Sequence, residues 1–318
     1  MPGIQNVPGT ITRNLQAFFL DGRYTVLDSP THDGLLLRPH HYDELTAAFG
    51  CDCSRMACAS FETCTTSEQS SKLVQSSGWT AIRYYYAAFF ACHALMRVYG
   101  ISCTNVESKH IKALREAAQT SGFGGPGEPF PGSGLFSCMW DSTANVLRVS
   151  NLSNAKGGTH EVTWKLFSQL LMDLSDKLLS NNAVGRKIDL QQCATRLDTL
   201  RGALSVLGCN GGNWLSVVRN KANYSHEYGL WFPYGKARTF YAKVHQIAAD
   251  SWLAEADQCP SVVSVAGSEV ETAVGLSGNL VALCRETMME LEKYSGEKNS
   301  FARASPLRLL RVVDELQV

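Results

Sequence analysis

The sequence has neither an excess of charge of one sign nor a long apolar run. Lysine and arginine total 29, and aspartate and glutamate also total 29. This balance excludes the global positive field of a general nucleic-acid coat or a membrane-surface protein, so any nucleic-acid contact must be local. No stretch of about eighteen uninterrupted apolar residues is present, and the first residues lack a basic segment followed by an apolar one. We therefore expect a cytoplasmic protein with no membrane partner.

Internal repeats, low-complexity tails and paired metal-binding cysteines are also lacking. The 11 cysteines are an odd number, and several fall in helical apolar patterns, which favours reduced thiols over disulfides. Four cysteines lie within residues 51–64, but only Cys51 and Cys53 are close together, whereas structural zinc sites usually use two close pairs. His40 and His41 are expected in a solvent-exposed loop rather than on a metal. We expect no metal and no other cofactor.

Helical periodicity of apolar residues dominates what is present. The strongest pattern, at residues 72–99, is apolar on most faces, which predicts a buried central helix that ends at Gly100. Further helices are predicted at residues 162–179, 190–207, 214–228, 236–254, 268–294 and 306–316. The expected fold class is therefore mainly α, a helical bundle.

Two regions depart from this periodicity. Residues 1–70 look mixed α/β, and Asp21-Gly22 between two apolar runs predicts a β-hairpin. Residues 121–134 form a Gly/Pro-rich loop that no regular element tolerates, followed by a short β segment at about 135–149. We expect an N-terminal elaboration at 1–70, a helical domain at 71–300 with a loop insertion at 121–160, and a C-terminal helix at 301–318.

The most informative polar pattern lies on the predicted helix 214–228, which Asn213 would cap. Arg219 and His226 are seven residues apart, and at about 100° per residue seven steps fall about 20° short of two full turns. Asn223 lies between them on the same face. The stripe therefore presents a fixed cation, an amide and an imidazole within two turns.

These residue types suit metal-free cleavage of RNA. Attack by the ribose 2′-OH needs a base, an acid for the leaving oxygen and positive charge on the transition state. The guanidinium fork of Arg219 matches phosphate oxygens, and the imidazole of His226 can transfer protons near neutral pH. A two-fold dimer would bring two such histidines together, one as base and one as acid.

Two segments together resemble the HEPN superfamily. These are residues 83–95, with the sequence RYYYAAFFACHAL, and residues 219–226, with the sequence RNKANYSH. Members of that family are similar in pairing an early Tyr/Phe-Ala-rich helix with a later helix that carries Arg, a polar residue and then His. The resemblance covers about residues 70–300. It implies an HEPN-like helical bundle and a homodimeric, metal-independent endoribonuclease that leaves a 2′,3′-cyclic phosphate, often a toxin or antiviral-defence effector controlled by an antitoxin or regulatory partner.

The predicted site contains six residues around this motif. Some relatives carry Arg-x4-Tyr in place of Arg-x4–6-His, and Arg219 with Tyr224 satisfies that version too, so either Tyr224 or His226 can fill the catalytic position. The expected catalytic residues are Arg219, His226 and Asn220, and the expected substrate-binding residues are Asn223, Tyr224 and Lys221.

Other interpretations of the same residues remain open. In a structural interpretation, Arg219 pairs with a carboxylate and His226 caps a neighbouring loop. The aromatic residues at 84–90 and His93 are expected mainly in the core, with one tyrosine hydroxyl available to line an RNA groove. A non-catalytic RNA- or nucleotide-binding module of a defence complex and a helical protein-interaction subunit are the competing functions. If RNA is the substrate, the neutral charge favours a structured target such as tRNA.

Overall fold

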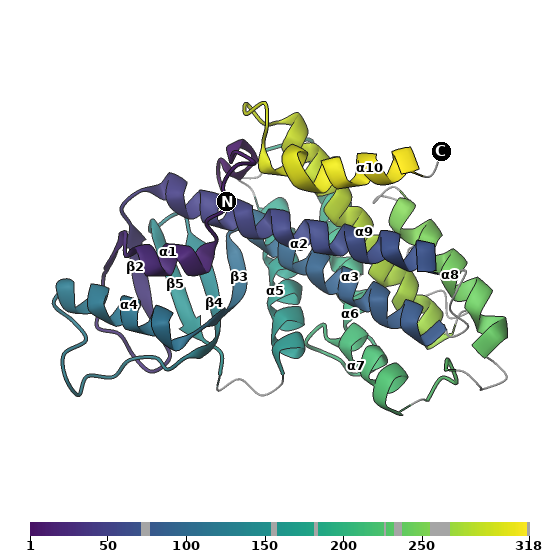
Figure 1. Ribbon diagram of the computed structural model, residues 1–318, viewed down its shortest axis with the longest axis horizontal. Coiled ribbons are helices and arrows are strands. Elements are labelled where there is room, and N and C mark those ends of the chain that lie inside the picture. The colour runs from purple at the N-terminus through teal and green to yellow at the C-terminus, as the bar shows by residue number, and fades with distance from the viewer. Residues whose placement is uncertain are drawn as a thin grey trace. The chain divides into compact units, whose positions relative to one another are not determined.

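Helices make up most of the structure, a computed structural model (Figure 1). It describes residues 1–70, 77–153, 158–180, 184–225, 227–231, 237–254 and 268–316. Its α-helices are α1 (Leu15–Asp21), α2 (Tyr42–Ser70), α3 (Ser77–Val98), α4 (Ser108–Thr120), α5 (Thr159–Leu179), α6 (Lys187–Leu204), α7 (Trp214–Asn220), α8 (Ala237–Leu253), α9 (Glu269–Lys293) and α10 (Arg308–Leu316). The mainly α prediction is confirmed. None of the helices described is both long and apolar enough to cross a membrane.

A five-stranded antiparallel sheet accompanies these helices. Its strands are β1 (Tyr24–Val26), β2 (Gly34–Pro39), β3 (Ile101–Val106), β4 (Gly134–Asp141) and β5 (Val146–Asn151), in the order β1-β2-β5-β4-β3. The central strand β5 pairs with β2 through Leu147 and Leu37, so the sheet joins the N-terminal segment to the region after the Gly/Pro-rich loop. Helix α4 lies beside α1 and β1 (Figure 1). The β segment predicted at 135–149 is confirmed by β4 and β5.

The chain divides into two compact units. Unit 1 contains Met1–Cys58, His93–Lys156 and Thr287–Val318, and unit 2 contains Ala59–Cys92 and Gly157–Glu286. The divisions fall inside α2, α3 and α9 and after residue 156, so unit 1 is built from three separate stretches of the chain. The reason is the long-range pairing of β2 with β5, which groups the N-terminal segment with residues far along the chain.

The hairpin predicted at Asp21-Gly22 is wrong. The first of its two apolar runs is the helix α1, because the Asn14 side chain caps its first turn by accepting a hydrogen bond from the Ala17 N–H at 2.9 Å. Gly22 then ends the helix with a φ of 65°, a left-handed conformation that glycine adopts without steric cost. The Asp-Gly pair is therefore a helix end, not a turn between strands.

The helix α2 accounts for much of the segment expected to be mixed. Its first turn carries Asp43 and Glu44, whose negative charges interact favourably with the N-terminal end of a helix dipole. The cysteines of residues 51–64 lie along this helix, and the Cys53 thiol donates to the Ala94 carbonyl at 3.4 Å. Burial raises the pKa of Cys53 to about 12, which keeps it a thiol. Nowhere in the described ranges do three or more His, Cys, Asp or Glu side chains form a group that could hold a metal ion.

The central strand gives a direct test of the packing. Leu147 on β5 is fully buried, whereas its neighbour Arg148 is exposed. We expect Leu147→Ala to lower the free energy of unfolding by about 2–5 kcal/mol, because it removes buried methyl groups and leaves a cavity. Urea denaturation followed by circular dichroism measures the loss. Arg148→Ala is the matched control and should change the free energy by less than about 0.5 kcal/mol; equal effects of the two substitutions would contradict the packing.

Candidate functional site

Arg219 lies at the end of the short helix α7 in unit 2. Asn213 stands at the N-cap position, as predicted, although its side chain makes no capping hydrogen bond. Trp214, Leu215 and Val218 on this helix are buried, and they anchor it in the core of the unit. Arg219 is buried together with these residues, and only 8% of it is exposed.

Aromatic rings of helix α3 surround the Arg219 guanidinium. Its central carbon lies 4.9 Å from the ring centroid of Tyr85 and 5.7 Å from that of Tyr86, within the range of cation–π attraction. Within the part of the chain that the structure describes, no carboxylate forms an ion pair with Arg219, and its Nε makes no hydrogen bond. A buried cation is costly unless an anion compensates it. This arrangement therefore favours binding of an anionic group.

A histidine outside the predicted motif completes the cluster. Nδ1 of His160, in the first turn of α5, lies 2.9 Å from the Tyr85 hydroxyl, which also accepts a hydrogen bond from Trp164 Nε1 at 3.3 Å. The imidazole packs 4.4 Å from the ring centroid of Phe89 and stays partly exposed. In either tautomer the other nitrogen, Nε2, is outside this hydrogen bond and could accept or donate a proton.

The pKa shifts in this cluster reflect burial and the charge of Arg219. Burial lowers the pKa of His160, and the positive charge of Arg219 lowers it further. Burial raises the pKa of Tyr85, while hydrogen bonding with Trp164, Ser216 and Arg219 opposes the rise. His160 is therefore neutral near pH 7, the form in which one ring nitrogen is free to act as a base.

A small void lies beside Arg219 in the described part of unit 2. A void of about 10 Å³ lies against Tyr85, Val218 and Arg219, enough space for about one water molecule. This void is too small for a phosphate group, whereas His160, on the outer side of the cluster, is partly exposed.

The other residues of the predicted site differ in exposure. Asn220 is exposed, Asn223 is half-buried, and Tyr224 is 71% exposed. His226 lies outside the described residues, so its predicted place beside Arg219 stays a prediction. Exposure makes Asn220 and Tyr224 accessible to a ligand, but no described contact joins either of them to Arg219.

Lys221 forms ion pairs of its own. Its Nζ lies 3.8 Å from Glu227 and 3.6 Å from Glu269, and the lysine side chain is 35% exposed. Two carboxylates therefore already compensate the positive charge of Lys221 when no phosphate is bound. Its predicted role in substrate binding would require exchange of these partners.

The predicted helix 214–228 is not one regular α-helix. Residues Lys221–Ser225 form a π-helical turn directly after α7, and Trp231 Nε1 donates to the Ala222 carbonyl of this turn at 2.7 Å. A π-helix has wider turns than an α-helix, with i→i+5 hydrogen bonds. The expected alignment of positions 219 and 226 assumed a regular α-helix, and residues 221–225 do not follow that geometry. Such turns occur frequently at functional sites.

Comparison with known proteins assigns no family to this chain. No protein-family model matches it, and neither does any curated protein or solved structure. The HEPN resemblance therefore stays a prediction from residues 83–95 and 219–226. The function must be inferred from the geometry around Arg219.

Sequence reasoning missed His160 and treated Tyr85 mainly as a packing residue. His160 and Tyr85 are 75 positions apart in the chain, so no local spacing connects them. The aromatic run at residues 84–90 does suggest a wall for a cation, but it does not show which ring meets Arg219. A histidine in the first turn of a helix has no local signature that separates it from a surface residue.

The charge of Arg219 should be visible in the titration of His160. We expect the pKa of His160 to lie below 6.5 and to rise in Arg219→Met, because a nearby positive charge disfavours the imidazolium. The lowered pKa also makes stability depend on pH. The contribution of His160 to the free energy of unfolding is fully present above pH 6.5 and is lost as the pH falls through the lowered pKa. NMR titration of the imidazole measures the value. Lys177→Met, about 25 Å along α5, is the control, and an unchanged His160 pKa in Arg219→Met would refute the coupling.

Proposed function

We propose that this protein is a metal-independent endoribonuclease that cleaves RNA by attack of the ribose 2′-OH and leaves a 2′,3′-cyclic phosphate. The observation that carries the proposal is the Arg219 guanidinium, buried on aromatic rings without a carboxylate partner among the described residues. A structural arginine would ordinarily be paired with a carboxylate when buried. Here the compensating anion would be the scissile phosphate.

Arg219 would bind the phosphate and stabilise its transition state. A guanidinium in a partly desolvated site interacts more strongly with a phosphate than it would in water, and its planar fork matches two phosphate oxygens. The rings of Tyr85 and Tyr86 hold it in place without neutralising its charge. The arginine would therefore meet the phosphate without first breaking an ion pair.

Histidines would transfer the protons. His160 is neutral and partly exposed next to Arg219, and in the tautomer with its proton on Nδ1 its Nε2 would take the 2′-OH proton. His226, which the motif predicts as catalytic, would then protonate the leaving 5′ oxygen. One base and one acid are the minimum that this reaction needs. With both histidines in one chain, a single copy could supply the pair, and a homodimer would supply it twice.

The biological setting that we propose follows the HEPN resemblance. The chain would act as a toxin or antiviral-defence effector, held in check by an antitoxin or regulatory partner. Its balanced charge gives no general affinity for polyanions, which supports a structured RNA such as tRNA as the target.

Cleavage assays in excess EDTA test the activity. Purified wild type, Arg219→Lys, His160→Ala and His226→Ala are incubated with total RNA and with tRNA, and the fragment ends are identified. We expect wild type to leave cyclic phosphate. Each histidine substitution should lower kcat by about 10²–10⁴-fold, the usual contribution of acid–base catalysis. Arg219→Lys should lower kcat by about 10²-fold or more, because a point charge replaces the bidentate fork.

An exposed histidine serves as the control for these variants. His32→Ala in unit 1 should cleave RNA as wild type does. Equal cleavage by every variant would mean a contaminating nuclease and would refute the site. No cleavage by wild type, together with RNA binding that Arg219→Lys weakens, would support the non-catalytic binding module instead.

Tyr85 is expected to act as a positioning residue. Tyr85→Phe removes the hydroxyl that contacts His160 Nδ1 but keeps the ring under Arg219. We expect kcat to fall about tenfold, about the value of one hydrogen bond, while KM stays unchanged. Tyr86→Phe is the matched control, because Tyr86 also faces Arg219 but does not hydrogen-bond to His160. Equal losses in the two variants would show that the Tyr85 hydroxyl has no specific role.

A further inference from the structure

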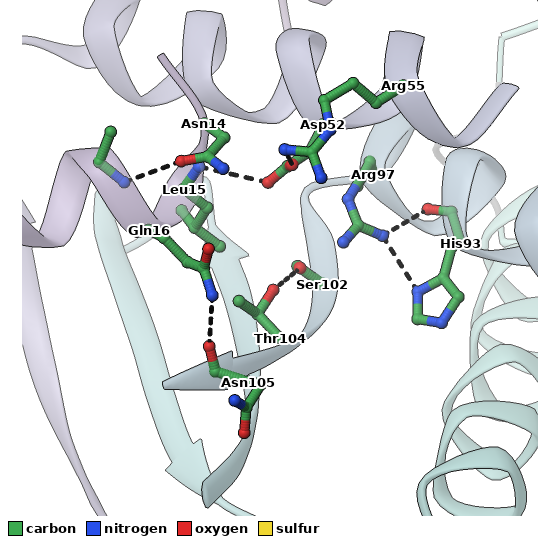
Figure 2. Close-up of polar contacts among 11 residues, drawn as sticks. Asn14, Leu15, Gln16, Asp52, Arg55, His93, Arg97, Ser102, Thr104 and Asn105 are labelled. Carbon is green, nitrogen blue, oxygen red and sulfur yellow. Dashed lines mark hydrogen bonds and ion pairs between the residues drawn. The ribbon is translucent and has the colours of Figure 1, made fainter. Parts of the chain in front are cut away.

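Unit 1 contains a separate polar cavity, independent of the proposed nuclease site. Its volume is about 150 Å³, and side chains of α1, α2, α3 and β3 surround it (Figure 2). The residues that line it include Asn14, Gln16, Asp52, Arg55, Arg97, Thr104 and Asn105, all with polar side chains. A cavity lined by so many polar groups differs from the dry apolar voids of protein cores.

Arg97 is the unusual residue of this cavity. Only 2% of it is exposed, and its Nη1 donates to the His93 carbonyl at 2.8 Å and to His93 Nδ1 at 3.1 Å. Its Nε is buried without a hydrogen bond, and no ion pair to Arg97 forms across the described ranges. Arg97 and Thr104 line the same cavity, and Figure 2 shows the two contacts from the Arg97 guanidinium to His93. A buried guanidinium thus faces the cavity with donors still available.

Asp52 does not neutralise the cavity. Its Oδ2 accepts a hydrogen bond from the Leu15 backbone N–H at 3.2 Å, and its Oδ1 lies 3.4 Å from Arg55 Nη1. The Asp52 side chain is 8% exposed, whereas that of Arg55 is 58% exposed at the edge of the cavity. The one carboxylate that lines the cavity is therefore engaged by Leu15 and Arg55, and none is paired with Arg97 among the described residues. Two arginines and one aspartate line the cavity, so its lining carries one net positive charge.

We propose that this cavity binds a small molecule through a single negatively charged carboxylate or phosphate group. The oxygens of that group would accept hydrogen bonds from Arg97 in the interior and from Arg55 at the edge, in the charge-assisted geometry typical of arginine. Asp52 in the same wall would repel a second negative charge, which favours a monoanion. A cavity of about 150 Å³ accommodates a ligand about the size of benzene, so a free nucleotide exceeds it.

Ligand titrations of the full-length protein test this proposal. Sodium acetate, inorganic phosphate and neutral acetamide are added at constant ionic strength, and binding is followed by calorimetry and by the melting temperature. We expect acetate or phosphate, but not acetamide, to raise the melting temperature saturably. Saturation by acetate alone identifies a carboxylate ligand, and saturation by phosphate alone identifies a phosphate ligand; either supports the site.

Two substitutions and a control locate the binding. Arg97→Met should abolish the response, and Arg55→Gln should raise the apparent Kd about tenfold through loss of one charge-assisted hydrogen bond. Because Arg55 is largely exposed, its substitution keeps the test valid even if Arg97→Met does not fold. Arg23→Gln, an exposed arginine that pairs with Glu44 and does not line the cavity, should bind as wild type.

Two results would overturn the proposal. One is an equal response to acetate, phosphate and acetamide, or no saturable response to any of them, which would mean that water alone solvates Arg97. The other is unchanged binding in both Arg55→Gln and Arg97→Met, which would place the anion elsewhere.

Discussion

The contact between the Arg219 guanidinium and the Tyr85 ring is the interaction on which the candidate site depends. Removing a guanidinium from water costs several kcal/mol, and a ring face at 4.9 Å returns only part of that cost. Burial lowers the pKa of His160, and the positive charge of Arg219 lowers it further. In the proposed reaction, this one buried charge would bind the phosphate and would also favour a neutral imidazole at His160.

The same physical principle operates in unit 1 with a different outcome. Arg97 is also buried without an ion pair among the described residues, but it borders a cavity of about 150 Å³, whereas the void beside Arg219 measures about 10 Å³. The cavity beside Arg97 has room for a small anion, whereas the void described beside Arg219 does not. The first geometry suits a small ligand, and the second suits a phosphate within a long chain such as RNA.

Local patterns predicted most helices correctly and failed where a competing local signal was stronger. The helices at 162–179, 190–207 and 268–294 are confirmed within a few residues, because their apolar periodicity reflects burial of one face. The Asp21-Gly22 hairpin failed because a capped helix precedes the glycine. Helix α2 was not anticipated, since it carries polar and small residues on faces that tertiary contacts bury.

The sequence by itself determined the helical class and singled out Arg219, because helical periodicity and a short polar motif are both local properties of the chain. Only the tertiary structure decided what Arg219 meets. The packing of α3, α5 and α7 within unit 2 brings Tyr85 and His160 to it, although these residues are distant in sequence. The π-helical turn at Lys221–Ser225 likewise arises within the fold, where Trp231 binds one of its carbonyls. Spacing rules assume a regular helix, and long-range packing changed that geometry.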